Sequence, residues 1–445
     1  TTANISAKTL TVSGITAANK TYNASTTATL STGSAAFVGI ESGDTVTIGV
    51  GSATGAFADK NIGTSKTVTI SGVTKSGTDA GNYVITQPST TANITAKGLT
   101  VTGITAANRV YDATTSATGL LDKTAAALSG VESGDTVTMS HSSATASFTD
   151  KNIGNGKTVN IAGITISGAD AGNYTLSQPS TTANITAKTL TVTGITASNR
   201  VYDATISATA LLSYGSAGLQ GTETGDTVTL DTTQIAAVFL NKNVGTGKSV
   251  VVSGLTIGGT DSGNYSLTQP TTTANITAKT LTVSGITAAN KTYNASTTAT
   301  LNTGSAAFVG IESGDTVTIG VGSASGTFAD KNIGTGKTVQ VSGVTKSGGD
   351  AGNYTITQPT TTANIIAKTL TVTGITAANR VYDATTSATA LLDKTSAALS
   401  GVESGDTVTM DHTSATATFG DKNIGTGKTV TISGITIDGA DSANY

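Results

Sequence analysis

The sequence is poor in the residue types that enzymes, metal centres and large apolar cores use. Its 445 residues include no cysteine, no tryptophan, two histidines and four prolines. Without cysteine, neither disulfides nor thiolate metal sites can form. Charged residues make up 11% of the chain and the net charge is −3, so there is no basic field for nucleic acid. We therefore expect no nucleic-acid partner.

Long apolar runs are also missing. No stretch approaches the length of a membrane-spanning helix, and none has the form of a signal peptide. We therefore expect no membrane insertion in this segment, and we expect any export signal or anchor to lie outside it. Valine, isoleucine and leucine still recur with the alternation typical of strands, which argues against disorder.

The sequence does contain a long repeat. The lysine of an Ala-Lys pair recurs every 89 or 91 residues, and ten of the eleven tyrosines occupy two positions in each repeat. Both histidines and both methionines are 271 residues apart, which is three repeats. A repeat of about 90 residues suits a small independent domain and is too long for a solenoid coil. The recurring residues are Lys8, Lys97, Lys188, Lys279 and Lys368, then Tyr22, Tyr111, Tyr202, Tyr293 and Tyr382, and finally Tyr83, Tyr174, Tyr265, Tyr354 and Tyr445.

These positions set the expected domain boundaries. Residues 1–7 are expected to be the closing strand of a preceding repeat, and residues 368–445 are expected to be a fifth repeat that lacks its closing strand. The complete repeats are 8–96, 97–187, 188–278 and 279–367.

Within a repeat, short segments alternate apolar and polar residues, as half-buried strands do. In the second repeat this holds for residues 136–139 and 157–167, and the alternation slips at Gly163, which predicts a β-bulge or a strand bend. No segment has helical periodicity. We predict an all-β fold, a linear array of five tandem antiparallel β-sandwich modules, immunoglobulin-like, that form an extended rod. The two tyrosine positions are expected to anchor each core, with their hydroxyls bonded at the domain margins.

The boundary between repeats has no spacer. Residues 182–186 are predicted to close the second repeat and residues 189–192 to open the third, with only Ala187 and Lys188 between them. Pro179 precedes the pair of strands and does not separate them. Such a joint favours a stiff array over flexibly linked domains.

Three segments carry a family resemblance: NRVYDATTSAT, DKNIGTGKTVTISG and GADAGNYTL. They resemble the YDG-type and related mostly-β repeats of large filamentous-haemagglutinin-like adhesins on Gram-negative bacteria. The motif Tyr-Asp-Gly is replaced by Tyr-Asp-Ala at Tyr111, Tyr202 and Tyr382, and by Tyr-Asn-Ala at Tyr22 and Tyr293. We expect this difference to change one turn and to leave the fold class intact. The resemblance implies stalk modules that carry a ligand-binding region away from the cell.

Most apparent chemical motifs are weak. The segment GTGKT at 425–429 resembles the end of a phosphate-binding loop, but the required earlier glycine is Lys422. His141 and His412 have no partner nearby in sequence for catalysis or metal binding. Asn-x-Ser/Thr triplets, for example at Asn173 and Asn184, leave glycosylation open. We predict no catalytic residue and no bound cofactor.

A Glu-x-Gly-Asp turn in every repeat is the one weak metal candidate. Two carboxylates beside a glycine could contribute to a Ca²⁺ site, although calcium takes six or more oxygen ligands. The alternative is a turn stabilised by the aspartate side chain. The candidate residues are Glu41, Asp44, Glu132, Asp135, Glu223, Asp226, Glu312, Asp315, Glu403 and Asp406.

The function that the sequence favours is a non-enzymatic structural stalk of a secreted bacterial adhesin at the cell surface. Its expected partners are the neighbouring repeats of the same chain. One alternative is a subunit or segment of a self-assembling surface fibre or surface layer, whose partners are other copies of the chain. A less favoured alternative is a protein whose Thr-x-Thr rows bind polysaccharide or ice.

Overall fold

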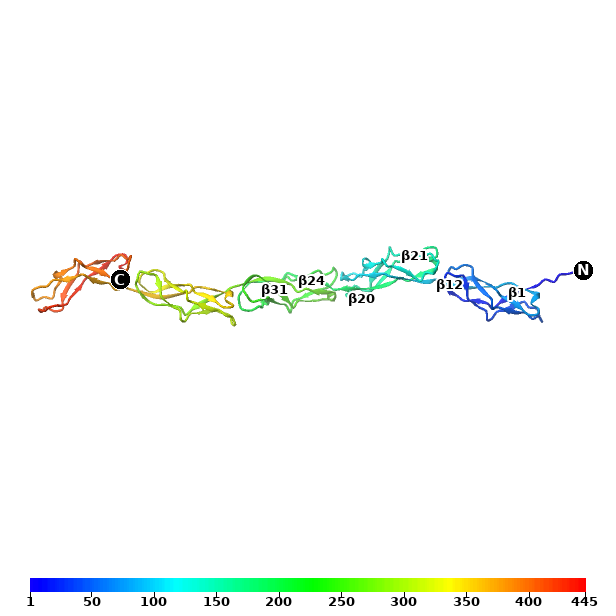
Figure 1. Ribbon diagram of the computed structural model, residues 1–445, viewed down its shortest axis with the longest axis horizontal. Helices are drawn as coiled ribbons and strands as arrows, with labels where there is room; N and C mark the ends of the chain where they lie inside the picture. Colours follow the sequence, from blue (N-terminus) through cyan, green and yellow to red (C-terminus); the bar gives the residue numbers. More distant parts are fainter. The chain divides into compact units, whose positions relative to one another are not determined.

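The computed structural model describes residues 1–445, and strands joined by turns and one-turn 3-10 helices make up the ordered elements (Figure 1). The all-β class and the five tandem repeats are confirmed. None of the helices is long and apolar enough to cross a bilayer. The chain divides into two compact units within the third repeat, and not at a boundary between repeats. The first unit is Thr1–Thr193, Gly218–Thr232 and Leu255–Thr268, and the second is Gly194–Ala217, Thr233–Gly254 and Gln269–Tyr445.

The second repeat, in the first unit, shows the pattern of a complete module. Its first strand is β13 and its closing strand is β23, and short strands and two 3-10 turns lie between them. The elements are β13 (Lys97–Thr102), β14 (Thr105–Ala106), β15 (Arg109–Val110), η2 (Thr118–Leu120), β16 (Leu121–Asp122), β17 (Ala127–Ser129), β18 (Thr138–Ser140), β19 (Thr145–Phe148), β20 (Gly154–Ala162), β21 (Thr165–Ser167), η3 (Ala171–Asn173), β22 (Tyr174–Leu176) and β23 (Ser180–Thr186).

Two larger sheets enclose the core of this repeat. One has the order β17-β13-β22 and the other the order β15-β23-β20-β19, and the pairs β14-β16 and β18-β21 form two separate two-stranded sheets. Val101 of β13, Val159 of β20 and Ile185 of β23 belong to one buried apolar cluster. The alternation of side chains along each strand therefore brings the two sheets together over a thin core.

Most strand pairs of the repeat are antiparallel, as expected, but two pairs are parallel. The first strand β13 runs parallel to β22, with Lys97 opposite Tyr174, and the closing strand β23 runs parallel to β15. A parallel pair needs a long crossover connection, and most of the repeat lies between β13 and β22. The same two parallel pairs occur in the first, third and fourth repeats.

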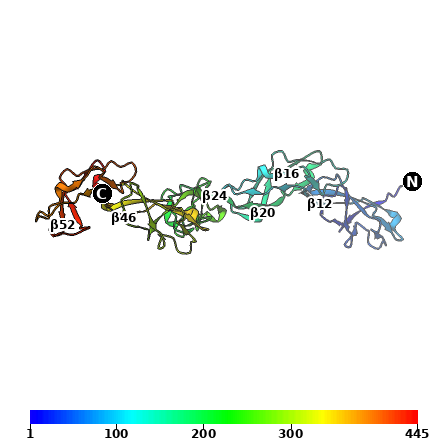
Figure 2. The ribbon, with the colours of Figure 1, turned by 60° about the vertical axis from the view of Figure 1, so that its left-hand side comes forward.

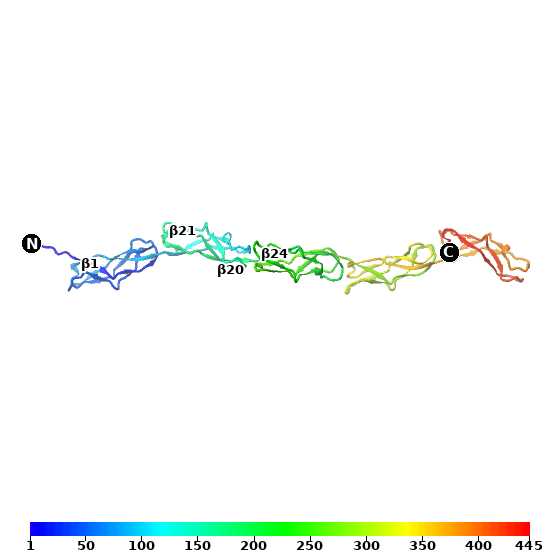
Figure 3. The ribbon, with the colours of Figure 1, turned by 180° about the vertical axis from the view of Figure 1, so that it is seen from behind.

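The slip in alternation at Gly163 marks a change of sheet. Gly163 has φ of 80° and lies between β20 and β21, which pair with different strands. Figure 3 labels both strands. An added Cβ atom there would lie 2.6 Å from the backbone oxygen of Ser143. A register shift of the kind expected for a bulge lies elsewhere, between Gly154 and Lys157.

In the second unit, the fourth repeat has the same two larger sheets, with the strand β38 (Thr298–Ala299) added beside β42. Figure 2 labels its closing strand β46. Its closing strand β46 lies between β43 and β37. The fifth repeat keeps the β52-β53 pair without a closing strand beside it. The strands concerned are β35 (Lys279–Ser284), β37 (Lys291–Thr292), β42 (Ser325–Phe328), β43 (Gly334–Ser342), β45 (Tyr354–Ile356), β46 (Thr360–Ile366), β52 (Thr416–Phe419) and β53 (Val430–Ser433).

The alanine that replaces the glycine of Tyr-Asp-Gly adopts a left-handed backbone conformation in all five repeats. In the second repeat Ala113 has φ of 60°. An L-residue with a Cβ atom is strained in this conformation, whereas glycine is not. The turn therefore holds an alanine in the conformation that glycine favours. The equivalent residues are Ala24, Ala204, Ala295 and Ala384.

We expect Ala113→Gly to stabilise the second repeat by about 1 kcal/mol, because it relieves the left-handed strain. The measurement is urea unfolding of residues 8–278 with and without the substitution. The matched control is Ala127→Gly in the exposed strand β17, which should cost about 0.5–1 kcal/mol. Loss of stability in both variants would contradict the strain argument.

Candidate functional site: the junctions between repeats

The predicted joint without a spacer is confirmed. Between the closing strand β23 and the next first strand β24 (Lys188–Thr193), the only residue is Ala187. The same single alanine separates β12 (Ser89–Thr95) from β13, and β34 (Thr271–Thr277) from β35. A connection of one residue leaves the chain almost no freedom to reorient one repeat against the next.

Two tyrosines from consecutive repeats meet at each joint. Tyr22 of the first repeat lies beside the end of β12, where its backbone N–H donates to the carbonyl of Thr95 at 2.8 Å. Its ring packs edge-on against Tyr174 of the second repeat, with centroids 5.2 Å apart and an interplanar angle of 75°. This geometry is favourable for aromatic pairs. Both rings are buried.

The two tyrosine hydroxyls donate to one carboxylate, that of Asp135 in the second repeat. Tyr22 donates to Oδ2 at 2.7 Å and Tyr174 to the same oxygen at 2.6 Å. The other oxygen, Oδ1, accepts from Lys60 Nζ of the first repeat at 2.6 Å. Only 1% of the Asp135 side chain is exposed. Both repeats thus supply donors to a single buried anion.

Further polar contacts surround this carboxylate. Lys60 also pairs with Asp170 Oδ1 at 2.7 Å. The buried Asn173 accepts from the backbone N–H of Ile62 at 2.9 Å and donates to Asn61 Oδ1 at 3.1 Å. The amide of Asn173 therefore bonds to the preceding repeat on both its oxygen and its nitrogen.

The apolar core is continuous across the joint. Leu99 and Tyr174 of the second repeat belong to the same buried cluster as Phe57 and Val68 of the first. Apolar burial and the polar cluster therefore hold the same pair of repeats together.

The other three joints reproduce this cluster within their own compact units. Each has two edge-on tyrosine rings, an aspartate that accepts from both hydroxyls, and a lysine from the preceding repeat. The sets are Tyr111, Tyr265, Asp226 and Lys151, then Tyr202, Tyr354, Asp315 and Lys242, and finally Tyr293, Tyr445, Asp406 and Lys331.

The ionisation of these groups follows from their environment. Burial disfavours the charged form of Asp406, but its bonds to Lys331, Tyr445 and Tyr293 outweigh burial and lower the pKa to about 2. The pKa of Asp135 is lowered against the same opposition from burial. Burial, followed by the bond to Asp135, raises the pKa of Tyr174 to about 12. The aspartates are therefore ionised and the tyrosines protonated at neutral pH, as the hydrogen bonds require.

The structure does not bring the Glu-x-Gly-Asp carboxylates together as a calcium site. In the second repeat Asp135 faces the tyrosines and Lys60, whereas Glu132 Oε1 accepts from Lys97 Nζ at 2.5 Å. Nowhere in the chain do three or more His, Asp or Glu side chains gather in a metal-binding group. Each of these aspartates has a cationic partner or a tyrosine hydroxyl beside it. The remaining glutamates, Glu41, Glu223, Glu312 and Glu403, pair in the same way with Lys8, Lys188, Lys279 and Lys368, and in the first repeat Asp44 accepts from Tyr83.

Other motifs that the sequence raised also have structural partners. The segment equivalent to GTGKT opens strand β43, with no helix after it whose N-terminus could bind phosphate. Asn184 on the closing strand accepts from the backbone N–H of Gly156 at 2.7 Å. His141 accepts a bond from Lys123 through its backbone carbonyl.

Sequence reasoning missed the lysine and asparagine of each joint. Lys60 and Asn61 recur as a Lys-Asn pair in every repeat, as Lys151, Lys242, Lys331 and Lys422 with the following asparagine. That recurrence indicates a structural role for the pair. It does not indicate whether the residues that bond to the lysine and the asparagine lie in the same repeat or in the next one.

We expect Tyr174→Ala to destabilise the second repeat by about 3 kcal/mol or more, because it leaves a cavity and removes a donor from a buried carboxylate. Urea unfolding of residues 8–278 measures the loss. The control is Tyr214→Ala, since Tyr214 is 39% exposed and should change stability by less than about 0.5 kcal/mol. A loss below about 1 kcal/mol for Tyr174→Ala would mean that the ring does not support the joint.

The joints are also expected to weaken in acid. The folded-state pKa of Asp406 lies below that of an unfolded aspartate, about 3.9, so its contribution is present above pH 4 and is lost as the pH falls toward 2. The melting temperature of the chain should fall over this range. Asp406→Asn should make the melting temperature less dependent on pH over this range. Asp438 is an exposed aspartate outside the joints, and Asp438→Asn should leave the pH dependence unchanged. An identical acid profile in all three proteins would contradict this assignment.

Comparison with known proteins agrees with the repeat structure. The YDG domain model matches residues 6–92, 95–183, 186–274, 277–363 and 366–445. A search of curated proteins gives no match. One solved structure, Drosophila N-cadherin EC1-4, is 7% identical over 67% of this chain and 82% of that chain, with a TM-score of 0.19, which is too low to carry an argument. Because the family model covers nearly the whole chain in five consecutive matches, the chain belongs to the YDG domain family.

Proposed function

We propose that the five repeats are a stiff, non-enzymatic stalk segment of an extracellular bacterial adhesin, which holds a binding region away from the cell surface. The observation that carries this proposal is the joint, where a buried Tyr-Tyr-Asp-Lys cluster joins each repeat to the next, with a one-residue connection at the first three of the four joints. The resemblance of the three repeated segments to adhesin stalks supports the extracellular setting.

The physical argument concerns the cost of bending. Opening the joint on one side would separate Tyr22 and Lys60 from Asp135, which belongs to the other repeat. A buried carboxylate that loses its donors is costly, typically about 3–5 kcal/mol when one partner of a buried pair is removed. Bending would also open the buried apolar cluster to which Leu99 of one repeat and Phe57 of the other belong. Each joint therefore resists bending more strongly than a flexible linker does.

The repetition of the same cluster favours a structural role over a catalytic one. The polar groups gathered at the joints are bonded to one another, so the tyrosine hydroxyls and the aspartate have little capacity left for a substrate. A stalk uses the same contact between repeats many times, whereas an enzyme usually has one cluster of catalytic residues in a chain.

The proposal predicts that a flexible insertion creates one bend. Gly-Ser-Gly-Ser between Ala187 and Lys188 should leave each repeat folded and shorten the maximum dimension of the chain in solution scattering. Five compact domains of about 30 Å in line would span roughly 150–200 Å. The control is the same insertion between Ser142 and Ser143, in an exposed turn within the second repeat, which should leave the dimension unchanged. A compact particle before any insertion would overturn the stalk.

A further inference from the structure

The chain carries Asn-x-Ser/Thr triplets in several different structural settings. Such a triplet is the acceptor motif for N-linked glycosylation and is used when it lies in a surface loop. The fold therefore determines which of these asparagines a sugar-transferring enzyme can reach. The asparagines of the ten triplets that follow residue 7 are Asn19, Asn23, Asn93, Asn173, Asn184, Asn264, Asn275, Asn290, Asn294 and Asn353.

Six of these asparagines are held inside the fold. Asn173 is buried in a joint and bonds to the preceding repeat through both its oxygen and its nitrogen. Asn184 is half-buried in the closing strand β23, which pairs with β20 on one side and β15 on the other. A sugar on either nitrogen would disrupt the joint or the sheet. The equivalents of Asn173 are Asn264 and Asn353, and those of Asn184 are Asn93 and Asn275.

Two further asparagines are exposed, but their triplets continue into a strand. Asn19 is followed by β3 (Lys20–Thr21), which pairs with the closing strand β12. Its Oδ1 accepts from the backbone N–H of Asn93 at 2.7 Å. Asn290 has the same place before β37 in the fourth repeat. An enzyme that binds the whole triplet would have to unpair the sheet at these two positions.

The triplet of Asn23 differs from all of these, because it lies entirely in an exposed turn. Residues 23–25 connect β3 to β4 (Thr27–Ala28), and no residue of the triplet belongs to a strand. The chain reverses at Ala24, which has φ of 55°. The triplet is therefore presented in a surface loop, which is the setting that the modification requires.

The contacts of Asn23 leave its amide nitrogen accessible. Asn23 is exposed, and its Oδ1 accepts from Lys20 Nζ at 3.0 Å and from the backbone N–H of Ser25 at 3.3 Å. Its Nδ2 makes no hydrogen bond within the chain. The turn thus holds the amide by its oxygen and directs no acceptor at its nitrogen. Asn294 is exposed and has the same two contacts in the fourth repeat.

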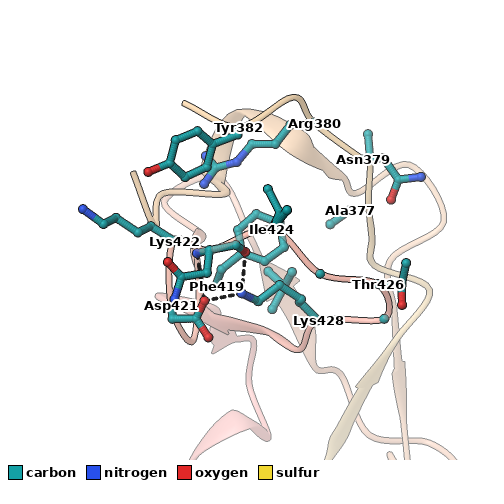
Figure 4. A pocket seen from close by; sticks show the side chains of 15 residues that line it. Ala377, Asn379, Arg380, Tyr382, Phe419, Asp421, Lys422, Ile424, Thr426 and Lys428 are labelled. Carbon is teal, nitrogen blue, oxygen red and sulfur yellow. Dashed lines mark hydrogen bonds and ion pairs between the residues drawn. The ribbon is translucent and has the colours of Figure 1, made fainter. Parts of the chain in front are cut away.

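The other three repeats have the same turn without an acceptor nitrogen. In the second repeat Asp112 takes the place of the asparagine, and its carboxylate accepts from Arg109 at 3.0 Å. A carboxylate has no nitrogen to which a sugar can be joined. Asp203 and Asp383 are the equivalents, and Figure 4 labels Arg380, the partner of Asp383 in the fifth repeat.

We propose that Asn23 and Asn294 are acceptor sites for N-linked glycosylation, and that the donor is a sugar activated as a diphosphate ester at its anomeric carbon. In the transfer, the bond between the anomeric carbon and the phosphate oxygen breaks, and a bond from that carbon to Nδ2 forms. The amide nitrogen loses one proton to a base of the transferase. The diphosphate leaves with the nucleoside or lipid that carries it. The transferase is a separate protein, and this chain supplies the acceptor.

Each acceptor directly follows a tyrosine of a joint. Tyr22 precedes Asn23 and Tyr293 precedes Asn294, and both tyrosine hydroxyls bond to the buried aspartate of their joint. A hydrated sugar in either turn would lie on the surface next to a joint. The inference goes beyond the proposed stalk and does not rest on it, because it depends on the exposure of the turn and not on the stiffness of the joints.

Peptide mass spectrometry of the chain isolated from the cells that produce it tests this proposal. We expect a sugar on the peptides that contain Asn23 and Asn294, and none on those that contain Asn173 or Asn184. Asn23→Gln should remove the sugar from the first repeat and leave the sugar of the fourth repeat in place. Unmodified Asn23 and Asn294, or sugar confined to the other triplets, would overturn the proposal.

The mass of the attached group distinguishes the two kinds of donor. Single sugars, or short chains of varying length, indicate a nucleoside diphosphate sugar that adds one unit at a time. One oligosaccharide of fixed composition at both sites indicates a donor assembled on a lipid. Either result supports the two acceptor sites.

A variant that gains a site tests whether the turn selects the acceptor. Asp112→Asn creates an Asn-Ala-Thr triplet in the equivalent turn of the second repeat, and we expect a sugar there when the variant is made in the same cells. The matched control is Asp112→Gln, which introduces a side-chain amide without the triplet and should stay unmodified. Circular dichroism checks that both variants are folded. A folded Asp112→Asn chain that carries sugar at Asn23 but none at residue 112 would show that the turn does not select the acceptor.

Discussion

The buried carboxylate at each junction, Asp135 and its equivalents, is the group on which contact between consecutive repeats depends. An ionised aspartate can be buried only if its oxygens are bonded, and here the donors come from two repeats. Removing the preceding repeat would leave the carboxylate without two of its hydrogen-bond donors, Tyr22 and Lys60. This dependence makes the neighbouring repeat a structural component of each module, in agreement with an apolar core that crosses the boundary.

The same constraint explains which parts of the repeat vary. The first and fourth repeats are two residues shorter than the second and third, and the difference falls in the segment after the left-handed alanine. There the shorter repeats form β4 (Thr27–Ala28) or its equivalent, and the longer ones form a 3-10 turn such as η2. The strand that follows is present in both kinds of repeat, as β5 (Leu30–Ser31) in the first and β16 in the second. The groups of the cluster keep their geometry at every joint, because the length change lies outside them.

The sequence could predict the all-β class, the strands and the joint without a spacer, since alternation and composition are local signals. It could not predict the parallel pairs, because alternation is the same in parallel and antiparallel strands. Nor could it pair Lys60 correctly. With a strict period, Lys60 could bond to Asp44 of its own repeat or to Asp135 of the next, and only the fold decides in favour of Asp135. The left-handed conformation of the alanines could not be predicted for a different reason. Alanine prefers negative φ, and a residue keeps a positive φ only where the surrounding structure imposes it.

The first strand and the closing strand of a repeat each pair in parallel with a different neighbour, and this pairing determines how the repeat responds to force. Tension along the chain pulls β13 by its amino end and β23 by its carboxyl end. Their neighbours β22 and β15 run parallel to them, so the paired strands are drawn in opposite directions along their length. The hydrogen bonds between them are then loaded in shear and must break together, whereas an antiparallel hairpin pulled from its open end loses its bonds one at a time. Resistance to pulling is therefore set by the rate of this concerted rupture rather than by the equilibrium stability of the repeat.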